Sequence, residues 1–255
     1  MIKKTTFISL SVLAYALVAV PIVACNAEQL NKSAGLIQIG EMHKVIGKKQ
    51  HHGRVELAEI VNKPHFYGVG ALEAIRGEIT VLNSVAIITG VTQDGRPQPM
   101  DSDAKATMIV GQSVSEWMDI TMTEEVSHEQ FDRTLKAMAT SKGIDVSKPF
   151  IFVIEGEFND VRLHVINGVC PIRARMMKLD THKGNKPFEL EVKTVNGTLV
   201  GVYAADSVGK LTHPATSTHT HLIYMDGKTG ERVTGHIEQV GLAKEAILKL
   251  PVSGK

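Results

Sequence analysis

The sequence predicts an α+β fold, mostly antiparallel β, in which two sheet systems and a few short helices form one compact unit. The composition is poor in aromatic residues (5%) and includes 22 glycines, and it is rich in Val, Ile and Thr, which favours many short strands over a helical bundle. Short apolar runs alternate with turn signals along most of the chain. No obvious linker separates the two halves, so residues 36–255 are predicted to form one domain.

The first half of this domain is predicted to be a β-meander. A short helix is expected over Val55–Val61, because its apolar residues have helical spacing and Pro64 must end it. Turns are predicted at Arg76-Gly77 and Asp94-Gly95. The expected strands are Leu36–Ile39, Tyr67–Leu72, Glu78–Leu82, Val85–Thr92 and a further strand within Met108–Met118.

The second half opens with a helix and then repeats the strand pattern. Ser127 is the expected N-cap of a helix that extends to about Ser141, and Gly143 stops it. The expected strands are Phe150–Gly156, Asp160–Val165, Phe188–Val195, Thr198–Ala204, His219–Asp226 and Glu231–Val240.

The overall composition excludes several classes of protein. At 43% hydrophobic and 22% charged residues, the chain is neither intrinsically disordered nor a multi-span membrane protein. There are 28 Lys and Arg against 27 Asp and Glu, and no basic block. Nucleic-acid binding is therefore disfavoured.

Residues 1–24 are predicted to be an export signal. A basic start at Lys3-Lys4 is followed by an uncharged apolar stretch from Phe7 to Val23. A transmembrane anchor is the weaker alternative, because this stretch is short for a span of ~20 residues and carries Pro21 near its end. We expect the mature protein in the bacterial periplasm or cell envelope.

Two processing sites fit this signal. Ile22-Val23-Ala24-Cys25 resembles a bacterial lipobox, in which cleavage precedes Cys25 and its thiol is lipidated; cleavage after Ala27 is the alternative. Residues 25–35 are then a flexible tether. Removal of Lys3 and Lys4 leaves 26 basic and 27 acidic side chains, a formal charge of −1. Once Cys25 is lipidated or removed, Cys170 is alone and no intramolecular disulfide can form.

Three histidines predict a metal site. His219 and His221 lie two residues apart on one strand, so their side chains share a face. If residues 227–230 form the hairpin loop, the numbers of facing residues sum to 457, which sets His221 opposite His236. Such pairs have Cβ atoms ~4.5–5.5 Å apart, close enough for both rings to bind one ion at ~2.0–2.1 Å.

The same register places Glu238 opposite His219, as a hydrogen-bond acceptor behind this ligand or a spare ligand. A single bulge would move His236 out of register. His213 precedes Pro214 in a loop and is a weaker alternative ligand. Three histidines with an open fourth position are typical of catalytic zinc.

Several segments together resemble the bacterial alpha-acetolactate decarboxylase family. Residues 66–82 resemble its Gly-x-Gly-Thr-Phe…Asp-Gly-Glu-Leu segment, and residues 195–201 resemble its Gly-Thr-Leu-Val-Gly run. His219-Thr220-His221, followed by Gly235-His236, resembles its zinc ligands. In order and spacing, these blocks cover most of residues 36–240.

The resemblance implies an acetolactate-decarboxylase-like fold with Zn²⁺ held by the three histidines. It also implies a lyase of acetoin biosynthesis, which decarboxylates a 2-hydroxy-2-methyl-3-oxo acid to acetoin. Glu78 matches the acid of the family's Gly-Glu-Leu motif, and the resemblance gives it the role of proton donor to carbon. Its alternative is a charged residue beside a turn. A Lewis-acid ion suits this chemistry, because it stabilises the charge left by departing CO2.

Two of the chain's departures from the family concern charged residues. Val153 stands where the family has an arginine in a strand of the form Ile-Arg-Ile-Asp-Gly-x-Phe, and the C-terminal tail offers no match for the family's acid. Arg162, Arg173 and Arg175 could replace the missing guanidinium, but each is expected at the surface. These departures leave the substrate in question.

Two functions therefore stay open. One is an exported zinc-dependent decarboxylase of alpha-acetolactate or a related 2-hydroxy-3-oxo acid. The other is a non-catalytic envelope protein that keeps the fold and binds a metal or ligand. In either case the expected partner is a small molecule, membrane contact occurs only through an N-terminal lipid anchor, and the sequence leaves a homodimer open.

Overall fold

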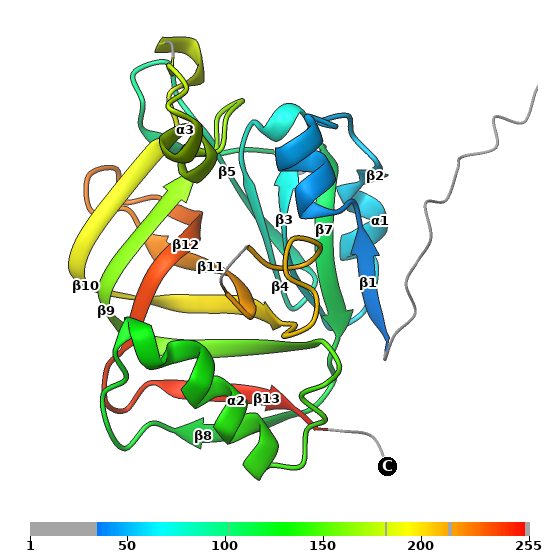
Figure 1. The fold of residues 1–255 in the computed structure, drawn as a ribbon, viewed down its shortest axis with the longest axis vertical. Helices are drawn as coiled ribbons and strands as arrows, with labels where there is room; N and C mark the ends of the chain where they lie inside the picture. Colours follow the sequence, from blue (N-terminus) through cyan, green and yellow to red (C-terminus); the bar gives the residue numbers. More distant parts are fainter. Residues whose placement is uncertain (1–34, 102, 182, 214–215, 253–255) are drawn as a thin grey trace, which may run out of the picture.

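The computed structural model describes residues 35–101, 103–181, 183–213 and 216–252 (Figure 1). The predicted signal peptide, Cys25 and residues 26–34 of the tether lie outside this range. Two antiparallel sheets pack against each other, with few and short helices, as the sequence predicts. Among the described residues, no helix has the length and apolarity that a membrane crossing requires.

The first sheet is the predicted meander with additions at its edges. Its strand order is β1-β7-β3-β4-β5-β6, and β2 pairs with β7. β7 pairs with β3 along one edge and with β1 and β2 along its other edge, so β1 and β2 lie on the opposite side of β3 from β4. The strands are β1 (Leu36–Ile39), β2 (Val55–Glu56), β3 (Phe66–Leu72), β4 (Glu78–Leu82), β5 (Val85–Val91), β6 (Pro97–Pro99) and β7 (Lys105–Ser113).

The second sheet curls until part of it closes. Its order is β10-β11-β12-β9-β13-β8, and β10 also pairs with β9, so β9, β10, β11 and β12 form a closed ring. The strands are β8 (Trp117–Thr121), β9 (Phe150–Val165), β10 (Phe188–Tyr203), β11 (Thr218–Met225), β12 (Arg232–Leu242) and β13 (Ile247–Pro251). β9 and β10 pair along almost their whole length, from Phe188 opposite Val165 to Tyr203 opposite Phe150.

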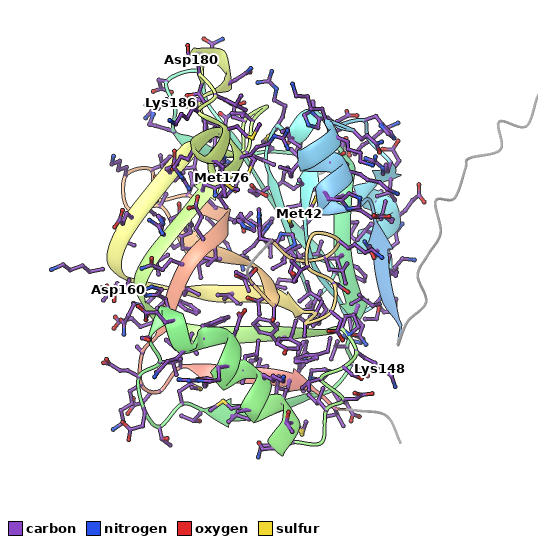
Figure 2. All side chains as sticks on the ribbon, viewed as in Figure 1. Met42, Lys148, Asp160, Met176, Asp180 and Lys186 are labelled. Carbon is purple, nitrogen blue, oxygen red and sulfur yellow. The ribbon has the colours of Figure 1, made fainter. Side chains whose placement is uncertain are left out.

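The helices are peripheral to the sheets. Single helical turns lie at His43–Gly47, Glu73–Ile75, His128–Gln130 and Lys183–Asn185, and the α-helices are α1 (Leu57–Val61), α2 (Phe131–Ser141) and α3 (Pro171–Met177). α2 buries Phe131, Leu135 and Ala139 against the curled sheet. Exposed residues such as Lys148, Asp160 and Asp180 lie at the periphery in Figure 2.

The second sheet has a core on each face. On one face, residues such as Phe152, Leu163 and Leu222 pack with α2. On the other face, Val200 and Val202 pack with Val69 and Val110 of the first sheet. Alternation along β11 places His219 and His221 on the same face as Ile223, which belongs to the core between the sheets. The predicted metal site therefore lies between the two sheets.

Candidate metal centre

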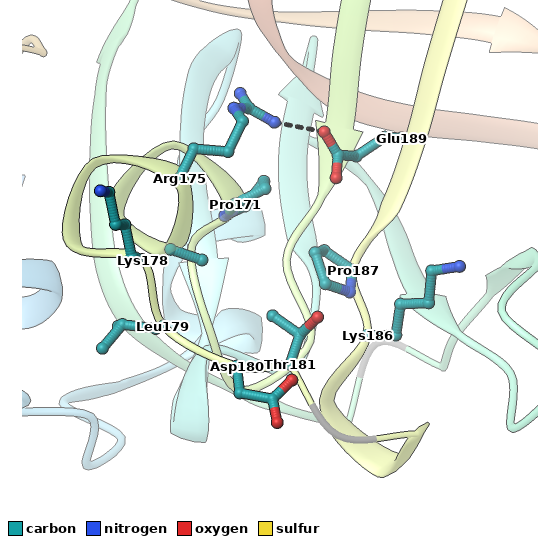
Figure 3. Close-up of a pocket in the computed structure, with 10 residues that line it drawn as sticks. Pro171, Arg175, Lys178, Leu179, Asp180, Thr181, Lys186, Pro187 and Glu189 are labelled. Carbon is teal, nitrogen blue, oxygen red and sulfur yellow. Dashed lines mark hydrogen bonds and ion pairs between the residues drawn. The ribbon is translucent and has the colours of Figure 1, made fainter.

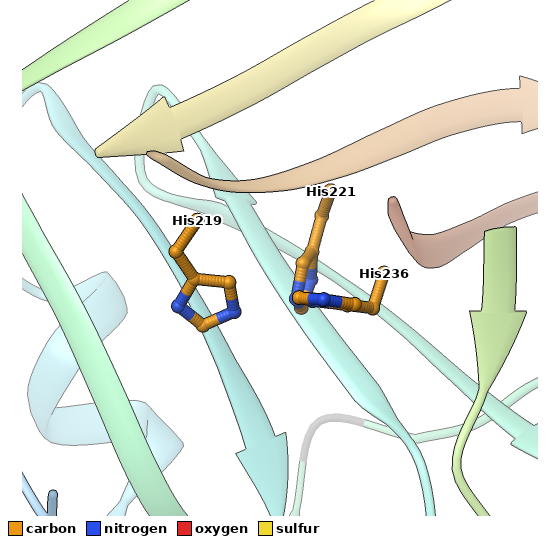
Figure 4. A group of neighbouring side chains, drawn as sticks. All are labelled: His219, His221 and His236. Atoms are coloured by element: carbon orange, nitrogen blue, oxygen red, sulfur yellow. The ribbon is translucent and has the colours of Figure 1, made fainter. Parts of the chain in front are cut away.

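The three predicted ligands come together in the structure. His221 lies opposite His236 in the β11–β12 hairpin, as the register arithmetic predicts. All three rings are buried, and one nitrogen of each of His219, His221 and His236 lies within 4.8 Å of the others (Figure 4). The ring centroids of His219 and His221 lie 5.0 and 5.4 Å from that of His236.

The surroundings of these rings suit a divalent metal ion. His219 Nδ1 lies 3.1 Å from the carbonyl oxygen of Leu211 and donates to it in the matching tautomer, which leaves Nε2 free. His221 Nε2 is buried without a hydrogen-bond partner. Burial lowers the pKa of His219 to about 3 and that of His221 and His236 well below its usual value. Neutral, converging imidazoles fit zinc.

His213, the weaker candidate, also lies beside the cluster. Its ring centroid is 4.8 Å from that of His236 and 6.5 Å from that of His219. It is half-buried, and burial lowers its pKa to about 4. His213 does not share the 4.8 Å grouping of the other three histidines.

Glu78 reaches the site from the first sheet. It is the first residue of β4, and only 3% of it is exposed. Its Oε2 lies 3.6 Å from His221 Nε2, and its Oε1 accepts a hydrogen bond of 3.2 Å from the amide of Ile166. Burial raises the pKa of Glu78 to about 8, although the Ile166 amide acts in the opposite direction. In the metal-free protein the carboxyl group is therefore protonated near neutral pH, as a proton donor must be.

The turn before Glu78 is held in place by contacts with the loop after β9. Arg76 donates to Asn167 Oδ1 at 2.9 Å and to the carbonyl oxygen of Gly184 at 3.1 Å. The amide of Gly168 donates to the carbonyl oxygen of Ile75 at 2.7 Å. Gly77 is required for close packing, because a Cβ there would lie 2.4 Å from a carbonyl oxygen. These contacts bring the Ile166 amide to Glu78.

A fourth buried histidine at the site, His164, was not predicted. It lies on β9 opposite His236, so His221, His236 and His164 form a row across three strands. The His164 and His236 ring centroids are 4.9 Å apart. His164 Nδ1 lies 2.8 Å from Glu238 Oε1, and its Nε2 lies 4.0 Å from Glu78 Oε1. Sequence alone offered no signal beyond a histidine in a predicted strand, because no short turn joins β9 to β12.

The predicted partner of Glu238 is wrong. Pairing between β11 and β12 runs only as far as His221 and His236. Beyond that point β12 follows β9 through two register shifts, so Glu238 contacts His164 and not His219. The strand arrangement changes because the ring of strands closes here.

Two guanidinium groups also contact Glu238. Arg175 forms an ion pair with it, and Arg162 Nε lies 3.6 Å from its Oε2. Burial acts to raise the pKa of Glu238, but hydrogen bonds from His164 and Arg175 and the charge of Arg175 outweigh it and lower this pKa to about 2. Glu238 is therefore ionised.

The arginine that the family places near Val153 has no direct replacement among the described residues of the site. Val153 is buried in the apolar core between the sheets with Ile151 and Val200. Arg162 and Arg175 are about half-exposed, as expected for surface residues, and reach the site only through Glu238.

A cavity of about 500 Å³ lies beside α3 (Figure 3). Arg175 lines it and pairs there with Glu189. Because Arg175 also pairs with Glu238, a chain of contacts joins this cavity to His164.

Comparison with known proteins gives one matching family and several structures of similar fold. The family model described as alpha-acetolactate decarboxylase matches residues 37–252. The chain is similar to the alpha-acetolactate decarboxylase of Bacillus subtilis strain 168, with 16% identity, a TM-score of 0.62 and coverage of 85% of each chain. For the acetolactate decarboxylase of Bacillus subtilis subspecies spizizenii, the identity is 18%, the TM-score 0.63 and the coverage 85% of each chain.

A Staphylococcus aureus protein of unknown function, described as similar to alpha-acetolactate decarboxylase, matches with 14% identity and a TM-score of 0.61 over 84% of each chain. The comparison with curated proteins gives no match. At these identities, the similar structures establish the fold. They confirm the predicted two-sheet, acetolactate-decarboxylase-like architecture.

Proposed function

The chain belongs to the alpha-acetolactate decarboxylase family, and we propose that it is an exported decarboxylase of that kind, which uses zinc to decarboxylate alpha-acetolactate or a related 2-hydroxy-3-oxo acid. The observation that carries the proposal is the juxtaposition of a buried histidine triad with a buried carboxyl group from the opposite sheet. The triad suits a metal ion, and Glu78 suits a proton donor.

His219, His221 and His236 would hold the ion. When bound, a divalent ion supplies Lewis acidity, which stabilises the negative charge that develops on the substrate's carbonyl oxygen. In the reaction, the bond between C2 and the carboxylate carbon breaks and CO2 leaves. The electron pair of this bond remains on the substrate as an enediolate.

Glu78 then completes the reaction. Its proton passes to the substrate carbon, which gives the hydroxy-ketone product, and its carboxylate must take up a proton before the next turnover. The burial that keeps Glu78 protonated also excludes water from the enediolate. The Ile166 amide holds Oε1, so the carboxyl group keeps one orientation.

Because Val153 stands where the family has an arginine, the expected rate of decarboxylation is lowered but not abolished. A charge-assisted contact to the substrate carboxylate contributes roughly 1.5–3 kcal/mol. Its loss corresponds to about ten- to a hundredfold in rate or affinity. We therefore expect measurable but weak activity.

The first prediction is that the zinc-loaded protein releases CO2 from racemic alpha-acetolactate faster than buffer with zinc. Glu78→Gln should lower the rate at least about a hundredfold, because the amide cannot deliver the proton. Zinc content, measured by elemental analysis, should stay unchanged. Glu59→Gln, which alters an exposed glutamate on α1, is the matched control and should retain the wild-type rate.

The alternative is a non-catalytic envelope protein, which the apolar residue at Val153 favours. Stoichiometric zinc without CO2 release above the buffer control would support that alternative and contradict decarboxylation of alpha-acetolactate. Equal rates for wild type and Glu78→Gln would contradict the role of Glu78 alone.

The second prediction concerns the exported form. If Cys25 is lipidated, wild-type protein should fractionate with membranes and Cys25→Ser should become soluble. Lipidation adds ~0.8 kcal/mol of membrane affinity per buried CH₂. Mass spectrometry of the mature N-terminus checks the result: a start at Glu28 would show cleavage after Ala27 instead, and an intact Met1 in cells would contradict signal-peptide cleavage.

A further inference from the structure

His164 is a buried polar residue that the proposed reaction leaves without a role. It is 1% exposed and lies next to His236 on the neighbouring strand. It stands outside the group of three histidines whose nitrogens lie within 4.8 Å of one another. Its position is therefore beside the metal centre and not within the ligand set.

Hydrogen bonding fixes the orientation of the His164 ring. Glu238 lies 2.8 Å from Nδ1, and its side chain is only 6% exposed. Glu238 is itself held by Arg175, which also pairs with Glu189 at the rim of the cavity beside α3 (Figure 3). An imidazole whose Nδ1–H donates to a carboxylate has a defined tautomer and a defined direction for Nε2.

The other nitrogen of His164 is available to a ligand. Nε2 faces Glu78 Oε1 at 4.0 Å, which is too long for a hydrogen bond. Glu78 Oε2 lies 3.6 Å from His221 Nε2, so the Glu78 carboxyl group stands between a proposed metal ligand and His164. A substrate close enough to take a proton from Glu78 is also close to His164 Nε2.

We propose that His164 Nε2 accepts a hydrogen bond from the 2-hydroxyl group of the substrate and so selects 2-hydroxy acids over analogues that lack this group. The inference rests on the proposed function for the identity of the substrate. In the tautomer whose Nδ1–H is donated to Glu238, Nε2 carries no proton and offers a lone pair to a donor. In a 2-hydroxy-3-oxo acid the carboxylate and the ketone are acceptors, and the hydroxyl is the only donor. Glu238 and Arg175 act as positioning residues.

The test is a binding measurement with ligands that cannot lose CO2. Isothermal titration calorimetry of zinc-loaded protein compares 2-hydroxy-2-methylpropanoate with 2,2-dimethylpropanoate, in which a methyl group replaces the hydroxyl. Wild type should bind the hydroxy acid more tightly. In His164→Phe, the ratio of the two Kd values should fall by about five- to tenfold. Zinc content should not change.

Two further variants test positioning. Glu238→Gln keeps an oxygen that can accept from Nδ1–H, and it should retain most of the wild-type ratio. Glu238→Leu removes the acceptor and should resemble His164→Phe. If His164→Phe does not fold, His164→Asn serves, because its polar side chain is too short to reach the substrate. His43→Phe is the control, since His43 contacts Glu41 and the Gly209 carbonyl oxygen.

An unchanged ratio of Kd values in the folded His164 variants would overturn the proposal. Loss of zinc from these variants would also overturn it, because it would assign the ring to the metal. The result is separable from the proposed function. A hydroxyl preference that depends on His164, found in a protein that releases no CO2, would leave this inference standing while the decarboxylase proposal fails.

Discussion

Burial shifts the pKa of Glu78 and the pKa values of the proposed ligands His219, His221 and His236 in opposite directions. Burial disfavours the charged form of every ionisable group, so it raises the pKa of a carboxylic acid and lowers that of an imidazole. At the site, this gives a protonated Glu78 beside neutral histidines. The proposed proton donor and the proposed metal ligands thus both have, at the same pH, the protonation state that these roles require.

A third prediction follows for the stability of the metal-free protein. Unfolded histidines bind protons below pH about 6.5, whereas folded His219 and His213 do so only near pH 3 and pH 4. Stability should therefore fall as the pH drops below 6.5. Glu78 keeps its proton up to pH about 8 when folded but loses it near pH 4.5 when unfolded, so its contribution falls as the pH rises between these values.

Below pH 6.5, the stability lost through several histidines exceeds the stability gained through the carboxyl group of Glu78. The free energy of unfolding should therefore be greatest near pH 6.5. Each group contributes a slope of at most about 1.4 kcal/mol per pH unit. Urea unfolding between pH 5 and pH 9 measures this profile. Glu78→Gln should lose the decline on the alkaline side and keep that on the acid side. An alkaline decline that persists in Glu78→Gln would show that another group causes it.

At the scale of the elements, local patterns predicted local structure well. The β11–β12 hairpin has the predicted register, since Met225 pairs with Arg232 and His221 with His236. The helix predicted after Ser127 is present as a single turn followed by α2. Alternating polarity and turn residues suffice for these elements, because each depends on residues close in sequence.

Boundaries were wrong where the sheet bends. The strands predicted at Phe150–Gly156 and Asp160–Val165 are one continuous strand, β9. Those predicted at Phe188–Val195 and Thr198–Ala204, on either side of Gly197, are likewise one strand, β10. Gly156 has a φ of 142°, which lets β9 bend without ending. One strand is expected within Met108–Met118. This range instead contains the end of β7, at Ser113, and the start of β8, at Trp117.

The unpredicted part of the site depends on strands distant in sequence. His164 meets His236 because β9 pairs with β12, and Glu238 meets His164 because β12 leaves β11 after His236. Neither event follows from the length of a turn or from hydrophobic periodicity. α3 was also missed, and with it the contact between Arg175 and Glu238.

At the scale of the whole molecule, the site joins the two sheets. The proposed ligands all belong to the second sheet, whereas Glu78 and Thr80 belong to the first. Thr80 Oγ1 lies 2.6 Å from Thr234 Oγ1 and 3.3 Å from His221 Nδ1. The amide of Thr234 donates to Thr89 Oγ1 at 2.8 Å. Polar contacts and a shared apolar core therefore link the two sheets around the histidines.

The final prediction is that zinc stabilises both sheets together, although its proposed ligands lie in one of them. A ligand present at 100 times its Kd stabilises the folded state by about 2.7 kcal/mol. For a chain of this size, that corresponds to roughly 5–11 °C in Tm. Calorimetry of zinc-loaded protein should show one transition, which a chelator moves down by this amount. His221→Ala should unfold at the same temperature with or without chelator, whereas His43→Ala should keep the shift. Two separate transitions, of which zinc moves only one, would show that the sheets unfold independently and that the contacts around Thr80 do not couple them.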